Sequence, residues 1–227
     1  MKAVDRLGWG FYTFAMNKPA MRMLLLVAVL ALPAGVRGQD YRFKTNNNAI
    51  IITRYTGHGG AVTIPCEING LPVTSLWDGA FVSNPSLTSV AIPSCITSIG
   101  GTEFGYCTNL ASVTILNGVT SIGYRALVSC EHLTSIIIPN SVTNIGTEAL
   151  SDCANLSNIT ISASVTKIGI GTFRNCYNLT GIKFNGNAPR LGVNVFNNCT
   201  NATIYYLPGT TGWGKTFGGR PTAVWKP

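Results

Sequence analysis

The sequence predicts a mixed α/β repeat protein, a right-handed solenoid of about six stacked coils of 23 residues each. Two observations predict this fold class. Five cysteines recur at intervals of 23 residues, from Cys107 to Cys199, and several apolar columns recur in the same register. A unit of this length cannot bury its apolar face alone, so the copies must stack and share one continuous core.

The apolar columns define which side chains face that core. A first column holds Leu87, Leu110, Leu133, Leu156 and Leu179. A second holds Leu76, Ile99, Ile122, Ile145, Ile168 and Leu191, and each member from Ile99 onward is followed by glycine. A third holds Phe81, Phe104, Leu127, Leu150, Phe173 and Phe196. Agreement of these registers over five to six copies predicts coils of one common geometry.

Each coil is expected to contain two extended pieces and one helical piece. In the unit 119–139, Ile136 and Ile138 alternate with polar residues, which predicts a short strand with one buried face. Residues 119–122 form a second short extended piece, and Gly123 allows a turn after it. Residues 126, 127 and 130 are apolar at a spacing that favours one or two helical turns.

The two ends of the repeat array look different from its middle. Residues 41–56 alternate around an Asn-rich turn at 46–48, which predicts a β-hairpin that caps the first coil. The last residues are rich in glycine and contain Trp213, Phe217 and Trp225, which predicts a C-terminal cap. The expected division is therefore a signal peptide at 1–38, an N-terminal cap and first partial coil at 39–70, the solenoid at 71–208 and a C-terminal cap at 209–227.

The leader predicts export. Residues 21–34 place basic residues before an apolar run of about a dozen residues, with small residues after it, as in a secretory signal peptide. Cleavage before Gln39 would put Val36 and Gly38 at the usual small-residue positions. An uncleaved N-terminal anchor is the alternative, and no membrane span is expected in the mature chain.

The repeat pattern V-T-S-I-G-x-x-A-F/L-x-x-C-x-x-L-T-S-V/I-x-I-P resembles the BspA-type leucine-rich repeat of bacterial and protist surface proteins. Residues 119–139 and 142–161 fit it well, residues 73–93 have Asn84 where cysteine is usual, and residues 96–115 have Glu103 in place of the small residue. Residues 190–208 are a degenerate last copy. The resemblance implies a secreted or cell-surface protein, with the periplasm as an alternative, that mediates protein binding or adhesion. A structural envelope component without a specific ligand is the alternative function.

Charge and motifs exclude several other classes. The formal net charge is +8, but residues 71–187 hold four basic against five acidic residues, so no basic stripe for nucleic acid is expected there. The sequence contains no nucleophile-elbow, P-loop or H-E-x-x-H motif, which predicts a non-enzymatic protein without a cofactor.

The cysteines are expected to be structural. With no C-x-x-C pair and two histidines, the ladder thiols are predicted to pack inward as small apolar groups. Cys66 and Cys95 each follow shortly after a proline at the end of a strand-like run. If they lie on neighbouring coils, they can form a disulfide in an oxidising compartment. The alternative, two free thiols, is the favoured prediction.

The outward strand face is the candidate binding surface for an unknown protein or glycan ligand of a monomeric protein. Alternation assigns seven residues to it: Ser112, Thr114, Ser135, Ile137, Asn158, Thr160 and Lys183. Three aromatic loop residues, Tyr106, Tyr124 and Tyr177, are further candidates.

Overall fold

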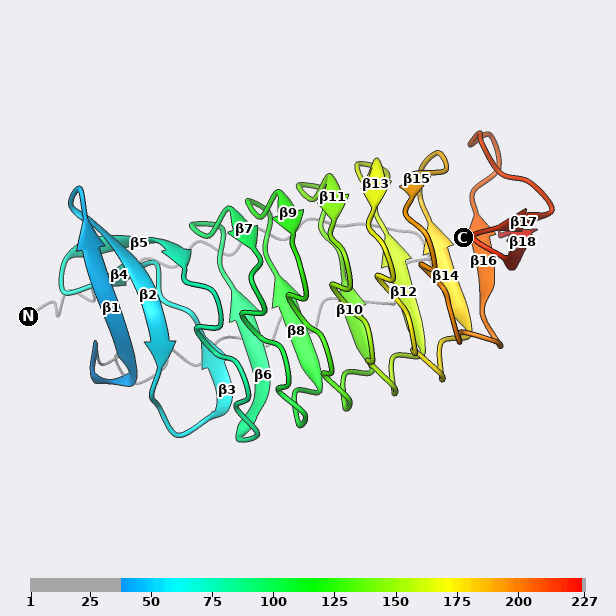
Figure 1. Ribbon diagram of the computed structural model, residues 1–227. Coiled ribbons are helices and arrows are strands. Elements are labelled where there is room, and N and C mark those ends of the chain that lie inside the picture. The colour runs from blue at the N-terminus through cyan, green and yellow to red at the C-terminus, as the bar shows by residue number, and fades with distance from the viewer. Residues whose placement is uncertain (1–37, 226–227) are drawn as a thin grey trace, which may run out of the picture. The chain divides into compact units, whose positions relative to one another are not determined.

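The computed structural model describes residues 38–225, which form a parallel-stranded solenoid (Figure 1). The predicted signal peptide at 1–38 lies, apart from its last residue, outside the described residues. The solenoid has about seven turns with repeats of about 23 residues, one turn more than the sequence predicted.

The largest sheet has nine strands in the order β17-β18-β16-β14-β12-β10-β8-β6-β3. Its strands are β3 (Gly60–Thr63), β6 (Leu87–Ile92), β8 (Ser112–Ile115), β10 (Ser135–Ile137), β12 (Asn158–Ile161), β14 (Gly181–Phe184), β16 (Thr203–Tyr206), β17 (Thr216–Phe217) and β18 (Arg220–Val224). All neighbours are parallel except β17 and β18. Figure 1 shows one strand of this sheet in each successive coil. Pairing joins residues 23 positions apart from β6 to β14, such as Ser135 with Asn158.

A second sheet lies on another side of the coils and has five parallel strands in the order β15-β13-β11-β9-β7. Its strands have two residues each: β7 (Ser98–Ile99), β9 (Ser121–Ile122), β11 (Asn144–Ile145), β13 (Lys167–Ile168) and β15 (Arg190–Leu191). Each strand puts one apolar residue into the core and one residue outward. These are the second extended pieces that the sequence predicted.

The N-terminal residues form a third sheet in the order β1-β2-β5-β4. Its strands are β1 (Tyr41–Asn46), β2 (Ala49–Tyr55), β4 (Glu67–Ile68) and β5 (Leu71–Leu76), preceded by a single 3₁₀ turn, η1 (Gly38–Asp40). The hairpin β1–β2 is antiparallel, and β2 pairs in parallel with β5. Ile50 and Ile52 of the hairpin are fully buried, so this hairpin shares the core of the first coils.

The helical piece is absent, and the prediction of a mixed α/β fold is wrong. Among residues 38–225 the one helical element is η1. The third side of each coil consists instead of a turn segment, found at 78–84, 101–107, 124–130, 147–153, 170–176 and 193–199. At least two residues in each segment have left-handed backbone conformation, such as Arg125 (φ 51°) and Ser129 (φ 56°) in 124–130.

Backbone hydrogen bonding explains why turns replace helix here. Within a segment one N–H closes a local turn, as when Val128 donates to the carbonyl of Arg125. The N–H of the residue before it donates to the following coil: Leu127 donates to the carbonyl of Ala149 at 2.8 Å. A helix, roughly 10 Å across, could not repeat at the spacing of about 4.8 Å that the strand ladders impose. Seven residues are also too few to stabilise a helix by themselves.

The core consists of the predicted columns, stacked from coil to coil. The members of the leucine column, Leu87 to Leu179, are all fully buried. Phe81 stacks on Phe104 with ring centroids 5.0 Å apart, and Phe173 stacks on Phe196 at 5.7 Å. The five ladder cysteines are also fully buried, which confirms that they point inward.

The glycine column is required by the close approach of adjacent coils. A Cβ on Gly146 would lie 2.6 Å from the carbonyl carbon of Gly123, and one on Gly169 would lie 2.4 Å from the backbone nitrogen of Thr147. The amide of Gly146 donates to the carbonyl of Ile122 at 2.6 Å. Neither glycine has a positive φ, so the absent side chain, and not turn formation, explains this column.

Candidate functional site

The outward face of the nine-stranded sheet carries the seven predicted residues in two aligned rows. Strand pairing aligns Ser112, Ser135 and Asn158 in one row. It pairs Ile137 with Thr160 and Thr160 with Lys183 in the other row, and Thr114 occupies the matching position of β8. Six of the seven are exposed and Thr160 is half-buried. The solenoid therefore brings together on one face residues that are up to 71 positions apart in sequence.

The middle of this face has an apolar character that the serines and threonines do not suggest. Ile137 is 65% exposed and Leu116, one residue after β8, is 48% exposed. Both line a hollow of about 410 Å³ at the C-terminal ends of the strands. Amide side chains of Asn117, Asn140 and Asn185 complete its rim. An exposed β-branched side chain beside a polar-rimmed hollow is a typical feature of a recognition surface.

The C-terminal end of the same face carries a cluster that sequence reasoning missed. Tyr205 pairs directly with Lys183 in the register of β14 and β16. The ammonium of Lys183 lies 4.9 Å from the centroid of the Trp225 ring. Tyr205 and Trp225 are both half-buried. Ile182 pairs with Ile204, which is 22 positions later instead of 23. Because of this one-residue shift, Tyr205 does not fall into the columns of period 23.

The three candidate tyrosines do not form one patch. Tyr106, Tyr124 and Tyr177 are 46%, 50% and 54% exposed, but they occupy three different positions of the repeat. Tyr124 lies under the guanidinium of Arg125 at 5.0 Å. None of the three belongs to the strands of the nine-stranded sheet, so they are separate from the face defined above.

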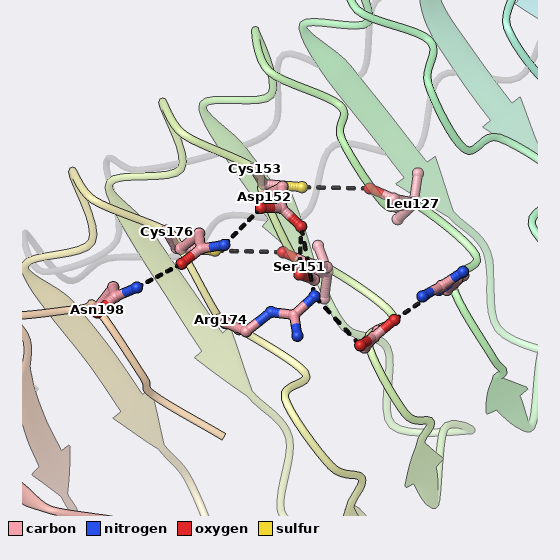
Figure 2. A network of polar contacts seen from close by, with 11 residues as sticks. Leu127, Ser151, Asp152, Cys153, Arg174, Cys176 and Asn198 are labelled. Carbon is pink, nitrogen blue, oxygen red and sulfur yellow. Dashed lines mark hydrogen bonds and ion pairs between the residues drawn. The ribbon is translucent and has the colours of Figure 1, made fainter. Parts of the chain in front are cut away.

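The cysteine ladder is a column of hydrogen-bond donors. Each thiol donates to the backbone carbonyl 26 residues earlier, as Cys130 does to Phe104 and Cys153 does to Leu127, both at 3.2 Å. Figure 2 shows the bond from Cys153 to Leu127. Burial raises the pKa of Cys107 to about 11 and that of Cys153 to about 12. At these two positions the protonated thiol is both the donor and the favoured form, so the hydrogen bonds stabilise the stack. Cys199 in the last coil differs, because the neighbouring thiol of Cys176 and the guanidinium of Arg220 lower its pKa.

A disulfide joins Cys66 to Cys95, with a Cα–Cα distance of 5.8 Å. The two residues follow β3 and β6, which are neighbours in the nine-stranded sheet. The sequence favoured two free thiols over a bridge at these positions; that preference is wrong, because the structure contains the bridge.

A polar network runs along the turn segments, outside the core (Figure 2). Glu148 accepts from Arg125 at 2.5 Å and pairs with Arg174 at 3.2 Å. Asp152 accepts from Asn175 at 2.6 Å, and Asn175 in turn accepts from Asn198 at 2.7 Å. Each of these side chains bridges one coil to the next, so the network ties coils together at their exposed edge.

A family model for the BspA-type leucine-rich repeat region matches six copies over residues 74–203, more than half of the chain. The chain belongs to this family. Family members are generally surface or secreted bacterial proteins, and the solenoid fold is typically non-enzymatic.

Two solved structures of bacterial leucine-rich-repeat proteins are similar to this BspA-type chain. A T. pallidum leucine-rich-repeat protein is 32% identical, covers 72% of this chain and 88% of its own, and superposes with a TM-score of 0.65. A leucine-rich cell surface protein of Faecalibacterium prausnitzii is 31% identical, with 74% and 53% covered and a TM-score of 0.55. The pneumococcal vaccine antigen PcpA is 16% identical, with 84% and 49% covered and a TM-score of 0.61, and shares the fold. No curated protein matches the chain.

Within this BspA-type array, Glu103 departs from the pattern. It takes the place of the small residue at the positions of Ala126 and Ala149, and it is only 4% exposed. The amide of Gly100 donates to its Oε2 at 3.1 Å. Burial, with a smaller contribution from Asp78, raises the pKa of Glu103 to about 9. Glu103 is therefore a neutral, buried acid at pH 7.

Two other kinds of feature are absent from residues 38–225. No three His, Cys, Asp or Glu side chains in that range are gathered closely enough to hold a metal ion. The same range contains no helix that is long and apolar enough to cross a membrane.

Proposed function

We propose that this BspA-type protein is a secreted or cell-surface recognition module that binds a protein or glycan ligand without catalysis. The ligand-binding surface is the outward face of the nine-stranded sheet. The observation that carries the proposal is the exposed Ile137 beside its polar-rimmed hollow, on a face otherwise composed of small polar side chains. Exposed apolar side chains that gather beside a hollow, as Ile137 and Leu116 do, form a surface that a ligand can cover.

The cluster of Lys183, Tyr205 and Trp225 supports the same surface. Tyrosine and tryptophan contribute most to binding when they are fixed by neighbours, because they lose little side-chain entropy. The cation–π contact with Lys183 helps to fix the Trp225 ring. We therefore place a second anchor of the ligand at the C-terminal end of the face.

The terminal sheets support a role as caps of the solenoid. We propose that residues 39–70 and 209–227 cover the open ends of residues 71–208, which would otherwise expose unpaired strand edges. In support, β1–β2 buries Ile50 and Ile52, and Trp213 packs against Phe184 with ring centroids 5.0 Å apart. Covered ends are also what a monomer requires.

The experiment is a binding screen of purified residues 39–227 against extracellular-matrix proteins, glycans and bacterial envelope fractions. Two variants disrupt the face: Ile137→Asn removes the apolar anchor, and Thr114→Arg/Thr160→Arg adds bulk and charge two coils apart. The matched control is Ser98→Arg/Asn144→Arg, which adds the same two charges at the same separation on the five-stranded sheet.

Saturable binding that both face variants abolish and the control retains is the expected result. Binding that survives both face variants would move the ligand site to another surface. Regular self-assembly of the purified protein, with no saturable partner in the screen, would instead support a structural envelope component.

A further inference from the structure

Charge is distributed unevenly along the solenoid. Residues 56–152 hold six acidic residues against Arg125, a formal net charge of 1 − 6 = −5. Residues 153–227 hold no acidic residue and seven basic ones: Lys167, Arg174, Lys183, Arg190, Lys215, Arg220 and Lys226. The formal net charge of residues 71–187 is close to zero, because this range includes part of the acidic region and part of the basic region and ends before Arg190. The C-terminal third is therefore strongly basic.

Two of these cations lie side by side on the five-stranded sheet. Lys167 on β13 pairs in register with Arg190 on β15, and both side chains are exposed. Earlier coils have Ser98, Ser121 and Asn144 at the same position. Ion pairs within residues 38–225 involve Arg125 and Arg174 but neither member of this pair. Like charges directly opposite each other on adjacent strands are destabilising, and a bound anion would remove that repulsion.

The pair lies beside two adjacent hollows. Lys167 and Arg190 line the first, of about 360 Å³, together with Thr147 and Ile170. The second, of about 480 Å³, shares Leu191 and Gly192 with the first and has Arg220 on its wall. Arg220 is held there by donation from its Nη1 to the carbonyl of Cys199 at 3.1 Å.

The second hollow also contains backbone donors without acceptors. In earlier coils the corresponding amides donate to the next coil, as Gly171 does to Val193 and Phe173 does to Val195. Asn194 and Phe196 begin the last turn segment, and within the described residues no carbonyl accepts from their amides. Both residues line the second hollow. Their N–H groups therefore add two donors to those of the cationic side chains.

We propose that Lys167, Arg190 and Arg220, with the free amides of Asn194 and Phe196, bind an anionic polysaccharide through its sulfate or carboxylate groups. The site is separate from the proposed ligand face and does not depend on it. Arginine donates two parallel hydrogen bonds to such oxyanions, which suits Arg190 and Arg220 to this ligand.

The surroundings favour a polysaccharide over two other polyanions. The hollow beside Lys167 and Arg190 is lined by no aromatic residue. Of the two in the second hollow, Phe196 is buried and Phe217 is half-buried, so the site offers little stacking surface for the bases of a nucleic acid. It also lacks the tryptophan or tyrosine anchors that dominate protein interfaces. Donors spread over neighbouring coils and two adjacent hollows suit a polymer with repeated charged groups better than a single small anion.

The test measures binding of the purified full chain to immobilised heparin, which is sulfated, and to hyaluronate, which is carboxylated, at several salt concentrations. Immobilised polyglutamate and duplex DNA are the comparison surfaces. The variant Lys167→Asn/Arg190→Ser introduces residues that other coils use at this position, so the fold should be retained. The control Arg42→Gln/Arg54→Gln removes the same charge from exposed positions of β1 and β2.

We expect salt-sensitive binding to at least one of the two polysaccharides. Comparison of the Kd values for heparin and hyaluronate shows whether the site prefers sulfate or carboxylate groups. The Lys167→Asn/Arg190→Ser variant should raise the Kd roughly tenfold, and the control should change it less than about twofold. Equal weakening in both variants would overturn the proposal in favour of net charge alone. Failure to bind either polysaccharide, or tighter binding to polyglutamate or DNA, would also overturn it. The Thr114→Arg/Thr160→Arg variant should retain polysaccharide binding, which separates this site from the proposed ligand face.

Discussion

Glu103 is the residue at which the repeat pattern and the physical environment conflict most. Its carboxyl occupies a buried position that other coils give to alanine, and its pKa is raised to about 9. Between pH 4.5 and 9 the folded state therefore keeps a proton that the unfolded state has lost. The free energy of unfolding should fall as the pH rises through this window.

The variant Glu103→Ala checks this directly. The free energy of unfolding, measured with urea, should decrease for the unmodified protein as the pH rises from 4.5 to 9. The decrease should be much smaller for Glu103→Ala. Equal pH dependence of the two proteins would show that Glu103 is ionised and solvated in the folded state.

The ladder cysteines illustrate a second effect of single residues. Cys153 donates its thiol proton to the carbonyl of Leu127, and both groups are buried. Cys153→Ala removes the donor and leaves a small void, so it should lower the free energy of unfolding by about 1–3 kcal/mol. Ser112→Ala on the exposed face is the control and should be nearly neutral. A neutral Cys153→Ala would mean that the thiol hydrogen bond contributes nothing to stability.

At the scale of the element, the glycine column offers a matched pair of substitutions. A Cβ on Gly146 would lie 2.6 Å from the backbone of Gly123, whereas one on Gly100 would have its nearest neighbour at 3.8 Å. Gly146→Ala should therefore lower the free energy of unfolding by about 1–3 kcal/mol, because adjacent coils would be forced apart. Gly100→Ala should be tolerated, since Gly100 begins the column. Similar urea midpoints for the two variants would contradict this explanation.

The strands were predictable from the sequence and the turn segments were not. Alternation at residues such as Ile136 and Ile138 depends on one strand and its buried face, which local sequence specifies. In the turn segments, apolar residues such as Ala126 and Leu127 have a helix-like spacing. Their backbone conformation is instead set by hydrogen bonds to the next coil, such as that of Leu127 with Ala149. Those partners lie 22 residues away, so no local pattern reports them.

For the candidate site, the regular columns predicted the rows from Ser112 to Lys183, and strand pairing aligns them as expected. Tyr205 and Trp225 were missed because they follow the degenerate last copy, where the spacing of 23 is lost. The exposure of Ile137 beside a hollow also depends on neighbouring coils. The side-by-side placement of Lys167 and Arg190 depends on the pairing of β13 with β15 in one sheet.

At the scale of the whole molecule, the disulfide links folding to an oxidising compartment. Cys66 and Cys95 close a loop of 29 residues around the first coils. Cys66→Ser/Cys95→Ser should lower the free energy of unfolding by roughly 3–4 kcal/mol through the entropy of the unfolded chain. Reduction of the unmodified protein should give the same loss.

Hydrogen exchange can locate that loss. Amides of β3 and β6 should exchange faster in Cys66→Ser/Cys95→Ser, while those of β12 should keep their protection, because repeat arrays unfold in parts. Unchanged stability and exchange in the variant would contradict a stabilising role of the bridge.

The regular hydrogen bonding between coils also constrains how such a gene can change in length. In the regular coils, each hydrogen bond from one coil to the next joins residues separated by about one repeat, as Thr143 and Thr120 do at 23 positions. Loss or gain of a complete repeat therefore leaves the remaining partners matched, whereas loss of a single codon leaves one coil short and shifts its bonds to the neighbouring coils. Recombination between similar repeats within the gene can thus lengthen or shorten the exposed sheet, and with it the proposed ligand face, without disturbing the core.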